Sequence, residues 1–447
     1  MTHTSANQPS AEQCDLLLSA KWIIPVIPKN KTYSDCSLVI TDGKISAILP
    51  TQEAKNRYQA KEQLDLGEHI ITPGLINAHG HAAMSLLRGY ADDLPLDTWL
   101  NEHIWPAEGQ HVSANFVKEG TQLAIAEMIR SGTTCFSDMY FFPDQTAAAA
   151  HDAGIRCQIT FPVLEFPSAW GSNADDYISK GLSLRDQYRS HELIKIQFGP
   201  HAPYTVSDET FARIAVLAPE LQSGIQVHLH ETKKEVTDSE NNEGKRPIQR
   251  LFDLNVLTPL TQCVHMTELN DDDIALIKKA GAHIIHCPES NLKLASGFCP
   301  AAKLLENGIN VALGTDGCAS NNNLDMFGEM HTAALLGKAV AGNAAALSAH
   351  QTLEMATING AKAMGIDNVT GSLEVGKDAD IIAIKIDPLE QAPLYDPLSQ
   401  LVYTHNGHRI SHSWVKGKSL MQNRQLMTLN EQEIIANSKQ WQDKIQS

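Results

Sequence analysis

The sequence is poor in basic residues: 35 Lys and Arg stand against 52 Asp and Glu, and the formal net charge is −17. Nucleic acids and anionic membranes are bound by clustered Lys and Arg. We therefore expect neither a nucleic acid nor a membrane as a main partner. The acidity otherwise indicates only a well-solvated surface.

Long apolar runs and paired cysteines are missing as well. No uninterrupted apolar run approaches the length of a membrane span, and residues 1–13 lack the apolar core of a secretory signal. The eight cysteines are scattered without a CxxC pair, and Cys135, Cys157, Cys263 and Cys287 lie in strand-like segments. We expect buried, reduced thiols in a cytoplasmic protein rather than disulfides.

Apolar residues are plentiful enough for a large core, at 43% of 447 residues. Strand-like and helix-like segments alternate from residue 70 onward, which predicts an α/β fold of the (β/α)8 TIM-barrel type. A doubly wound open sheet is the alternative, but no Gly-rich phosphate loop supports it. The expected strands are 70–79, 133–139, 155–163, 194–201, 224–230, 262–266, 283–288 and 310–316, with helices such as 117–131 and 271–280 between them.

The two chain ends have strand character of their own. At the N-terminal end, the dipeptide Asp42-Gly43 is a hairpin signal between two apolar segments. Strand-like segments return at 380–384 and 413–418, and the polar tail from Leu429 is expected to be helical. We predict a composite β-sandwich domain of residues 1–72 and 377–447 beside a barrel of residues 73–376.

Polar residues suited to a metal or a substrate follow most of the expected barrel strands, where such barrels build their active sites. His79 and His81 end the first strand two residues apart, so both should point to one side. Any one histidine alone would more often be structural, but histidines end four of the eight strands. The candidates are His79, His81, Asp138, His201, His228, His230, His265, Cys287 and Asp316.

One subset of these candidates has the composition of a catalytic metal site. His79, His81 and His228 can supply three nitrogens and Asp316 one oxygen, a set that suits zinc with an open position for water. Fe2+ and Mn2+ remain alternatives. His230 could replace His228, but His228 is preferred because it leaves Glu231 at the HxxE spacing.

Three residues are candidates for proton transfer. Glu231 could protonate a substrate atom, His265 could orient the attacking water or act as a base, and Asp316 could both bind the metal and accept a proton. Each has an ordinary alternative: a carboxylate at a helix start, a buried hydrogen-bonded histidine and a turn residue.

Four pieces of the chain together resemble one known family: the PGLINAHGH segment at 73–81, the HxxE of His228 and Glu231, His265, and the GTDG segment at 314–317. By these pieces the chain is identified as a member of the amidohydrolase superfamily. The resemblance implies one divalent metal per subunit and a split β-sandwich. The fourth strand end has no Lys for a carbamylated bridge, so the resemblance is to the mononuclear deaminase branch.

Within that branch the chain resembles the deaminases of 5'-methylthioadenosine and S-adenosylhomocysteine. The matching pieces are Leu86–Gly89, Trp99 with Glu108 nine residues later, and segments 199–204 and 290–297. The resemblance implies that Glu108 binds the ribose hydroxyls, His201 contacts the substrate and Trp99 lines the pocket. It also implies a homo-oligomer, with a dimer as the expected form. A core anchor at Trp99 and a solvated helix charge at Glu108 are the ordinary alternatives.

The segment 160–170 departs from members that accept S-adenosylhomocysteine well, because it is apolar and contains no Arg. We therefore rank 5'-methylthioadenosine first as substrate, with adenosine and S-adenosylhomocysteine below it. The expected reaction is hydrolysis of a cyclic amidine C–N bond to a 6-oxopurine nucleoside and ammonia. The alternatives are an aminohydrolase or chlorohydrolase of guanine, cytosine or an aminotriazine such as N-ethylammeline, and a non-catalytic metal-binding scaffold.

Overall fold

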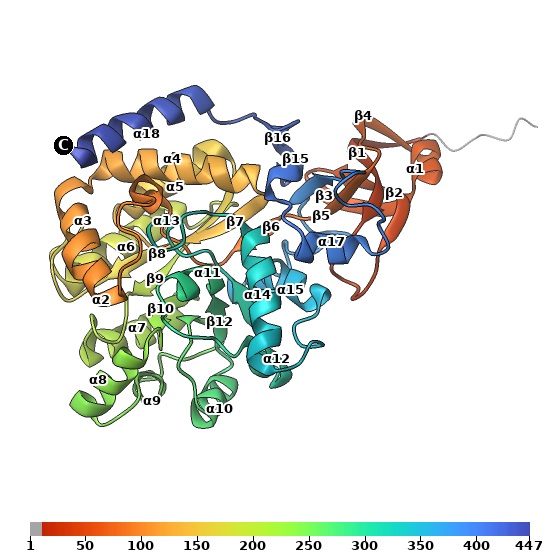
Figure 1. Cartoon of the computed structure of the whole chain (residues 1–447). Coiled ribbons are helices and arrows are strands. Elements are labelled where there is room, and N and C mark those ends of the chain that lie inside the picture. The colour runs from red at the N-terminus through yellow and green to blue at the C-terminus, as the bar shows by residue number, and fades with distance from the viewer. Residues whose placement is uncertain (1–10) are drawn as a thin grey trace, which may run out of the picture.

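The computed structural model describes residues 11–447 and contains an eight-stranded parallel sheet whose strands follow chain order (Figure 1). The N–H of Ala78 donates to the carbonyl oxygen of Leu313 at 2.9 Å, which joins the first strand to the last. The closed sheet and its surrounding helices confirm the predicted (β/α)8 barrel. Its strands are β6 (Leu75–Asn77), β7 (Thr133–Asp138), β8 (Arg156–Val163), β9 (Ile194–Pro200), β10 (Ile225–Leu229), β11 (Thr261–His265), β12 (His283–His286) and β13 (Val311–Leu313).

Local sequence signals explain where helices begin and end. At the start of α10 the side chain of Asn270 accepts from the N–H of Asp273, and the side chain of Asp273 accepts from the N–H of Asn270, both at 2.9 Å. Gly281, with φ 71°, ends the helix, so the predicted range 271–280 is confirmed. The helical segments before β10 are α1 (Thr51–Arg57), η1 (Ala82–Leu87), α2 (Leu96–Thr98), η2 (Trp99–Ile104), α3 (Trp105–His111), α4 (Ala114–Arg130), α5 (Pro143–Ala153), α6 (Ala174–Tyr188) and α7 (Asp208–Glu220). Those after it are α8 (Lys233–Glu243), α9 (Pro247–Asp253), α10 (Asp271–Ala280), α11 (Pro288–Lys293), α12 (Ala301–Glu306), α13 (Cys318–Asn321), α14 (Met326–Ala341), α15 (Ala349–Met355), α16 (Ile358–Ala363), α17 (Pro397–Tyr403), η3 (Gly407–Arg409) and α18 (Glu431–Gln446).

Both chain ends contribute to a second sheet, seen in Figure 1 as red and blue strands beside the barrel. Its order is β17-β16-β15-β14-β5-β1-β2-β3, with β4 paired to β1. The predicted hairpin is present, and Asp42 and Gly43 both have positive φ, as a type I′ turn requires. The strands are β1 (Glu12–Ile23), β2 (Tyr33–Thr41), β3 (Lys44–Pro50), β4 (Tyr58–Asp65), β5 (His69–Pro73), β14 (Ile381–Lys385), β15 (Ile410–Val415), β16 (Lys418–Gln422) and β17 (Gln425–Leu426).

The segment predicted as one strand over 70–79 is two strands in different sheets. β5 ends at Pro73 and pairs with β14, whereas β6 begins at Leu75 and pairs with β7. The chain changes sheets at Gly74, where a Cβ atom would lie 1.9 Å from the hydroxyl oxygen of Thr134. His79 therefore lies beyond the end of its strand, and its carbonyl is held there by the N–H of Asp316 at 3.1 Å.

The C-terminal helix is present as predicted but packs on the barrel rather than on the second sheet. α18 runs along α4 (Figure 1), and the ring of Trp441 lies 5.2 Å from that of Phe116. The predicted composite domain therefore does not include this helix in its packing. The domain boundaries at 72/73 and 376/377 stay a prediction, and residues 1–10 lie outside the described residues.

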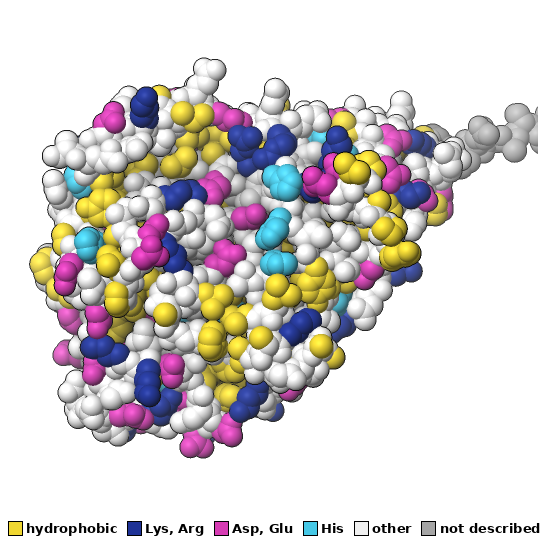
Figure 2. Space-filling view, in the orientation of Figure 1, with side chains coloured by type: hydrophobic (Ala, Val, Ile, Leu, Met, Phe, Trp, Pro, Cys, Tyr) yellow, Lys and Arg dark blue, Asp and Glu magenta, His cyan; other side chains and the backbone are white. Residues whose placement is uncertain are grey.

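The surface and the thiols agree with the composition. Figure 2 shows basic side chains scattered singly or in small groups among acidic ones on the visible face. Within residues 11–447 no helix is long and apolar enough to cross a membrane. All eight cysteines are buried and free, which confirms the expected buried thiols.

A buried ion-pair cluster joins the barrel to the second sheet. Arg156 at the start of β8 donates to Asp380 at 2.9 Å and to Asp378 at 3.0 Å, and all three side chains are buried. Burial alone would lower the pKa of the guanidinium, but the two carboxylates raise it. The cluster therefore fixes the approach to β14 against the N-terminal end of the barrel.

Replacing Arg156 by Met should lower the free energy of unfolding by about 3–5 kcal/mol, because two buried carboxylates lose their partner. Urea denaturation measures the change. The control is Lys21→Met, which removes an exposed pair with Asp35 and should cost less than about 1 kcal/mol. Equal losses in the two variants would contradict the assignment.

Candidate active site

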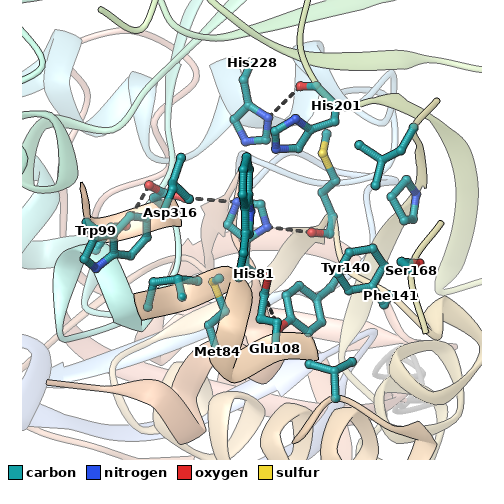
Figure 3. A pocket seen from close by; sticks show the side chains of 18 of the residues that line it. His81, Met84, Trp99, Glu108, Tyr140, Phe141, Ser168, His201, His228 and Asp316 are labelled. Carbon is teal, nitrogen blue, oxygen red and sulfur yellow. Dashed lines mark hydrogen bonds and ion pairs between the residues drawn. The ribbon is translucent and has the colours of Figure 1, made fainter. Parts of the chain in front are cut away.

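The four predicted metal ligands come together at the C-terminal ends of the barrel strands. The Nε2 atoms of His81 and His79 lie 3.2 and 3.5 Å from Oδ1 of Asp316. The Nε2 atom of His228, in β10, lies 3.2 Å from that of His79. Figure 3 shows His81, His228 and Asp316 facing one space. Two overlapping groups of potential donors result, His79/His81/Asp316 and His79/His228/His265, each with its atoms within 4.8 Å.

Each of the three histidines predicted as ligands has its Nδ1 atom beside a fixed oxygen. The acceptors are Gln226 Oε1 for His79 at 2.8 Å, the Met139 carbonyl for His81 at 2.6 Å and the His201 carbonyl for His228 at 2.7 Å. A backbone carbonyl can only accept, so His81 and His228 donate from Nδ1. Gln226 can donate through its Nε2 to the carbonyl of Ala78 at 3.0 Å, which leaves its oxygen to accept from His79. The Nε2 lone pairs therefore point inward.

The inward lone pairs of His79 and His228 would repel each other at 3.2 Å without a positive charge between them. Burial lowers the pKa of both imidazoles, so neither is protonated at neutral pH. His81 is the exception: burial lowers its pKa, but the contact with Asp316 outweighs this and raises the pKa to about 9. The raised pKa of His81 means that the space between these residues favours positive charge. Three nitrogens and one carboxylate around such a space fit a divalent metal.

The carboxylate of Asp316 has a defined orientation. Its Oδ2 atom accepts from the hydroxyls of Ser290 at 2.6 Å and Ser320 at 2.8 Å, which leaves Oδ1 facing the histidines. Burial would raise its pKa, but the contacts with His79 and His81 hold the pKa well below its usual range. Asp316 is thus a carboxylate at neutral pH, able to bind a cation or accept a proton.

Backbone strain is concentrated at these strand ends. His230, His265 and Asp316 have φ values of 53°, 75° and 61°, a region that non-glycine residues rarely occupy. Such conformations cost roughly 1–3 kcal/mol each and persist only where the surroundings determine them. The strand ends of the site are therefore held by specific contacts.

The structure separates His230 from the cluster of potential metal donors. Its Nδ1 donates to the carbonyl of Glu268 at 2.9 Å, and its Nε2 accepts from the N–H of Ile248 at 3.1 Å. Both ring nitrogens are used by the backbone, and burial lowers the pKa of the ring to about 4. Of the two histidines considered for the fifth strand, His228 is the one that faces the other ligands.

Glu231 and His265 form an acid and a neutral imidazole beside the cluster. The Nε2 of His265 lies 3.8 Å from the Glu231 carboxyl, and its Nδ1 donates to the side-chain oxygen of Asn291 at 2.9 Å. Burial raises the pKa of Glu231 to about 8, and the charge of Asp316 adds to this. Burial lowers the pKa of His265. At neutral pH Glu231 can therefore donate a proton.

One cavity of about 300 Å³ connects the cluster to the other predicted residues. Trp99, Glu108 and His201 all line it. Trp99 begins η2, a π-helical turn of a kind common at functional sites. Glu108, in α3, accepts from the hydroxyl of Tyr140 at 2.5 Å (Figure 3). Burial raises the pKa of Glu108 and the hydrogen bond from Tyr140 lowers it, and the net result is a pKa of about 7.

The wall of the cavity formed after β8 is apolar. Pro162, Leu164, Phe166 and Ala169 line it, and no Lys or Arg does. This part of the cavity therefore suits an uncharged group better than a carboxylate.

Other residues of the site were not predicted. Gln226 lies two residues before His228, so strand alternation could have placed it on the same face. Ser320 follows Asp316 by four residues, one helical turn. No sequence signal marks Tyr140. Asp138, predicted only as a strand-end candidate, instead accepts from the N–H of Ala82 at 2.6 Å and so fixes the chain after His81.

Comparison with known proteins places the chain among hydrolases. The model of the amidohydrolase family matches residues 70–420. A 5-methylthioadenosine/S-adenosylhomocysteine deaminase of Teredinibacter turnerae is 56% identical over 431 residues, with 96% of this chain and 98% of the relative covered. A 5'-deoxyadenosine deaminase of Methanosarcina mazei is 42% identical over 421 residues, with 94% and 96% covered. The structure of a zinc-bound adenosine deaminase from Xanthomonas campestris has a TM-score of 0.96 and 45% identity, with 98% and 99% covered.

Replacing Gln226 by Met should weaken zinc binding about 10- to 100-fold, because His79 loses the acceptor that fixes its tautomer. Competition with a chromogenic chelator measures the affinity. The control is Gln391→Met, which alters a buried glutamine that follows β14 and bonds Asn406, and it should leave the affinity unchanged. Unchanged affinity in the Gln226 variant would show that the contact does not orient the ligand.

Proposed function

This chain belongs to the amidohydrolase family, and we propose that it is a metal-dependent deaminase that converts 5'-methylthioadenosine to its 6-oxopurine nucleoside and ammonia. The observation that carries the proposal is the single cavity shared by the donor cluster, Glu231 and Glu108. It offers a metal, a proton donor and an acceptor for ribose in one space. A free base or a triazine needs no diol acceptor, so the buried Glu108 favours a nucleoside over the alternatives.

The chemistry of the cavity wall supports the choice among nucleosides. The 5' substituent is assigned to the wall of Leu164 and Phe166, where an uncharged methylthio group can be buried and a zwitterionic tail finds no Arg or Lys. S-Adenosylhomocysteine and adenosine therefore rank below 5'-methylthioadenosine.

The mechanism follows from the protonation states of the residues. Glu231, protonated at neutral pH, donates to N1 of the adenine ring and makes C6 electrophilic. Asp316 accepts a proton from the attacking water, with His265 orienting that water, and passes the proton to the departing amine. The C6 hydroxyl then loses its proton, which restores Glu231 and leaves the 6-oxopurine. A divalent metal held by His79, His81, His228 and Asp316 supplies Lewis-acid activation of water when bound. Zinc as that metal, a cytoplasmic location and a dimer are parts of the same proposal.

The direct test is a deamination panel on zinc-loaded protein, followed by loss of adenine absorbance and release of ammonia. The panel holds 5'-methylthioadenosine, 5'-deoxyadenosine, S-adenosylhomocysteine, adenosine, adenine, guanine and cytosine. We expect kcat/KM for 5'-methylthioadenosine to be the highest and within the range of about 10⁴–10⁸ M⁻¹s⁻¹ typical of working enzymes. Activity on guanine or cytosine alone would overturn the nucleoside assignment.

The ribose role of Glu108 predicts a pH dependence. Its raised pKa of about 7 means that the carboxylate, the better acceptor for two hydroxyls, is lost as pH falls below 7. For 5'-methylthioadenosine, kcat/KM should therefore fall about tenfold per pH unit below 7, and it should fall again above about 8, where Glu231 loses the proton that it donates.

The matched variant is Glu108→Gln, which cannot ionise. It should lower kcat/KM at pH 8 about 10- to 100-fold by weakening a charge-assisted hydrogen bond, and it should lose the acid limb that Glu108 causes. An identical acid limb in both proteins would contradict the role.

A further inference from the structure

The carboxyl group of Glu235 bonds the backbone on either side of the peptide that joins His230 to Glu231. One oxygen accepts from the N–H of His230 at 2.9 Å, and the other accepts from the N–H of Glu231 at 2.7 Å. Glu235 has no place in the donor cluster or in the mechanism above. Its two bonds nevertheless reach the residue that carries the acidic proton.

The chain needs such a contact because it leaves the barrel sheet here. β10 ends at Leu229, and the next residue, His230, has a φ of 53°. That turn takes the N–H groups of His230 and Glu231 out of the strand ladder, where they would lack a partner. An unpaired buried N–H costs about 1–3 kcal/mol, so the carboxyl group that accepts from both stabilises this turn.

The opposite side of the same segment is held by Thr267. Its N–H donates to the carbonyl of His230 at 2.9 Å, and its hydroxyl donates to the carbonyl of Glu231 at 2.7 Å. The backbone of Glu231 is therefore bonded at its N–H by Glu235 and at its carbonyl by Thr267. Little freedom remains for the direction in which the Glu231 side chain leaves the backbone.

Helix capping alone does not account for the position of Glu235. Thr232 caps α8 by accepting from the N–H of Glu235 at 3.2 Å. In an ordinary capping box the Glu side chain would return the bond to the N–H of Thr232 itself. Here the side chain reaches further back, to the two residues before the cap.

We infer that Glu235 is a positioning residue that sets, through the backbone, where Glu231 delivers its proton. The inference rests on the proposed deaminase function. The two residues have different roles: Glu231 contacts the substrate, and Glu235 holds the turn between the metal ligand His228 and Glu231.

The test is a double-mutant cycle of Glu235→Gln and Glu231→Gln in the zinc-loaded enzyme with 5'-methylthioadenosine. A glutamine keeps the volume but offers one acceptor oxygen for two N–H groups. We expect Glu235→Gln to lower kcat about 10- to 100-fold, because small misplacements of a reacting group cost this much. KM should change less than about 3-fold and zinc content should not change, because the ligands and Glu108 are untouched.

In the Glu231→Gln background, followed at high enzyme concentration by ammonia release, Glu235→Gln should add less than about a 2-fold loss, since the two residues act as a unit. Additive losses would assign Glu235 a general structural role and overturn the inference. Glu235→Asp, which keeps both acceptor oxygens on a shorter arm, should recover part of the loss. Glu243→Gln, an exposed change at the end of the same helix, is the control and should not alter kcat.

Hydrogen exchange of the amides of His230 and Glu231 tests the positioning role of Glu235 independently of the proposed deaminase function. Both should exchange faster in Glu235→Gln than in the parent protein, whatever the substrate. Unchanged exchange or unchanged kcat in that variant, with an active parent, overturns the positioning role alone. A parent without deaminase activity on any nucleoside overturns the proposed function and, with it, the role of Glu231 that Glu235 supports.

Discussion

The site depends on the hydrogen bonds that fix the outer nitrogens of three imidazoles. Because His79, His81 and His228 each donate from Nδ1 to a rigid oxygen, each turns Nε2 to the same space, with an unshared electron pair on His79 and His228 and a proton on His81 that a cation can replace. Neutral nitrogens at 3.2 Å and one buried carboxylate make that space favourable for a cation. The contacts with His79 and His81 keep Asp316 ionised, while burial keeps Glu231 protonated. Acid and base are thus separated within one cavity.

The barrel is the framework for this arrangement, and the residues at its strand ends adopt strained backbone conformations. Closure of the sheet through Ala78 and Leu313 brings the first and last strand ends together, which places His79 against Asp316 although they are far apart in sequence. The residues with positive φ at the ends of the fifth, sixth and eighth strands show where the chain bends away from regular pairing. Each bend aims a side chain into or away from the cavity, and His230 is the one that is turned away.

Much of this could be predicted from sequence, because apolar strand segments and the polar residues that follow them are local signals. The eight strands, the hairpin at Asp42-Gly43 and α10 lie close to where the pattern predicts them. The change of sheet at Gly74 could not be predicted, since it depends on the close approach of Thr134, which is distant in sequence. The HxxE spacing favoured His228 over His230, and the structure supplies the physical reason: the left-handed backbone of His230 breaks the two-residue alternation that would point both imidazoles to one side. Tyr140 contributes through its contact with Glu108 in α3, for which the sequence offers no local signal.

The most direct measurement is anomalous X-ray diffraction at the zinc absorption edge on crystals of the zinc-loaded protein. We predict one anomalous peak per chain, bonded to Nε2 of His79, His81 and His228 and to Oδ1 of Asp316, with the rings oriented by the same Nδ1 contacts. A peak bonded to His230, or two metal peaks in the barrel, would contradict the mononuclear site from which the protonation states and the mechanism follow.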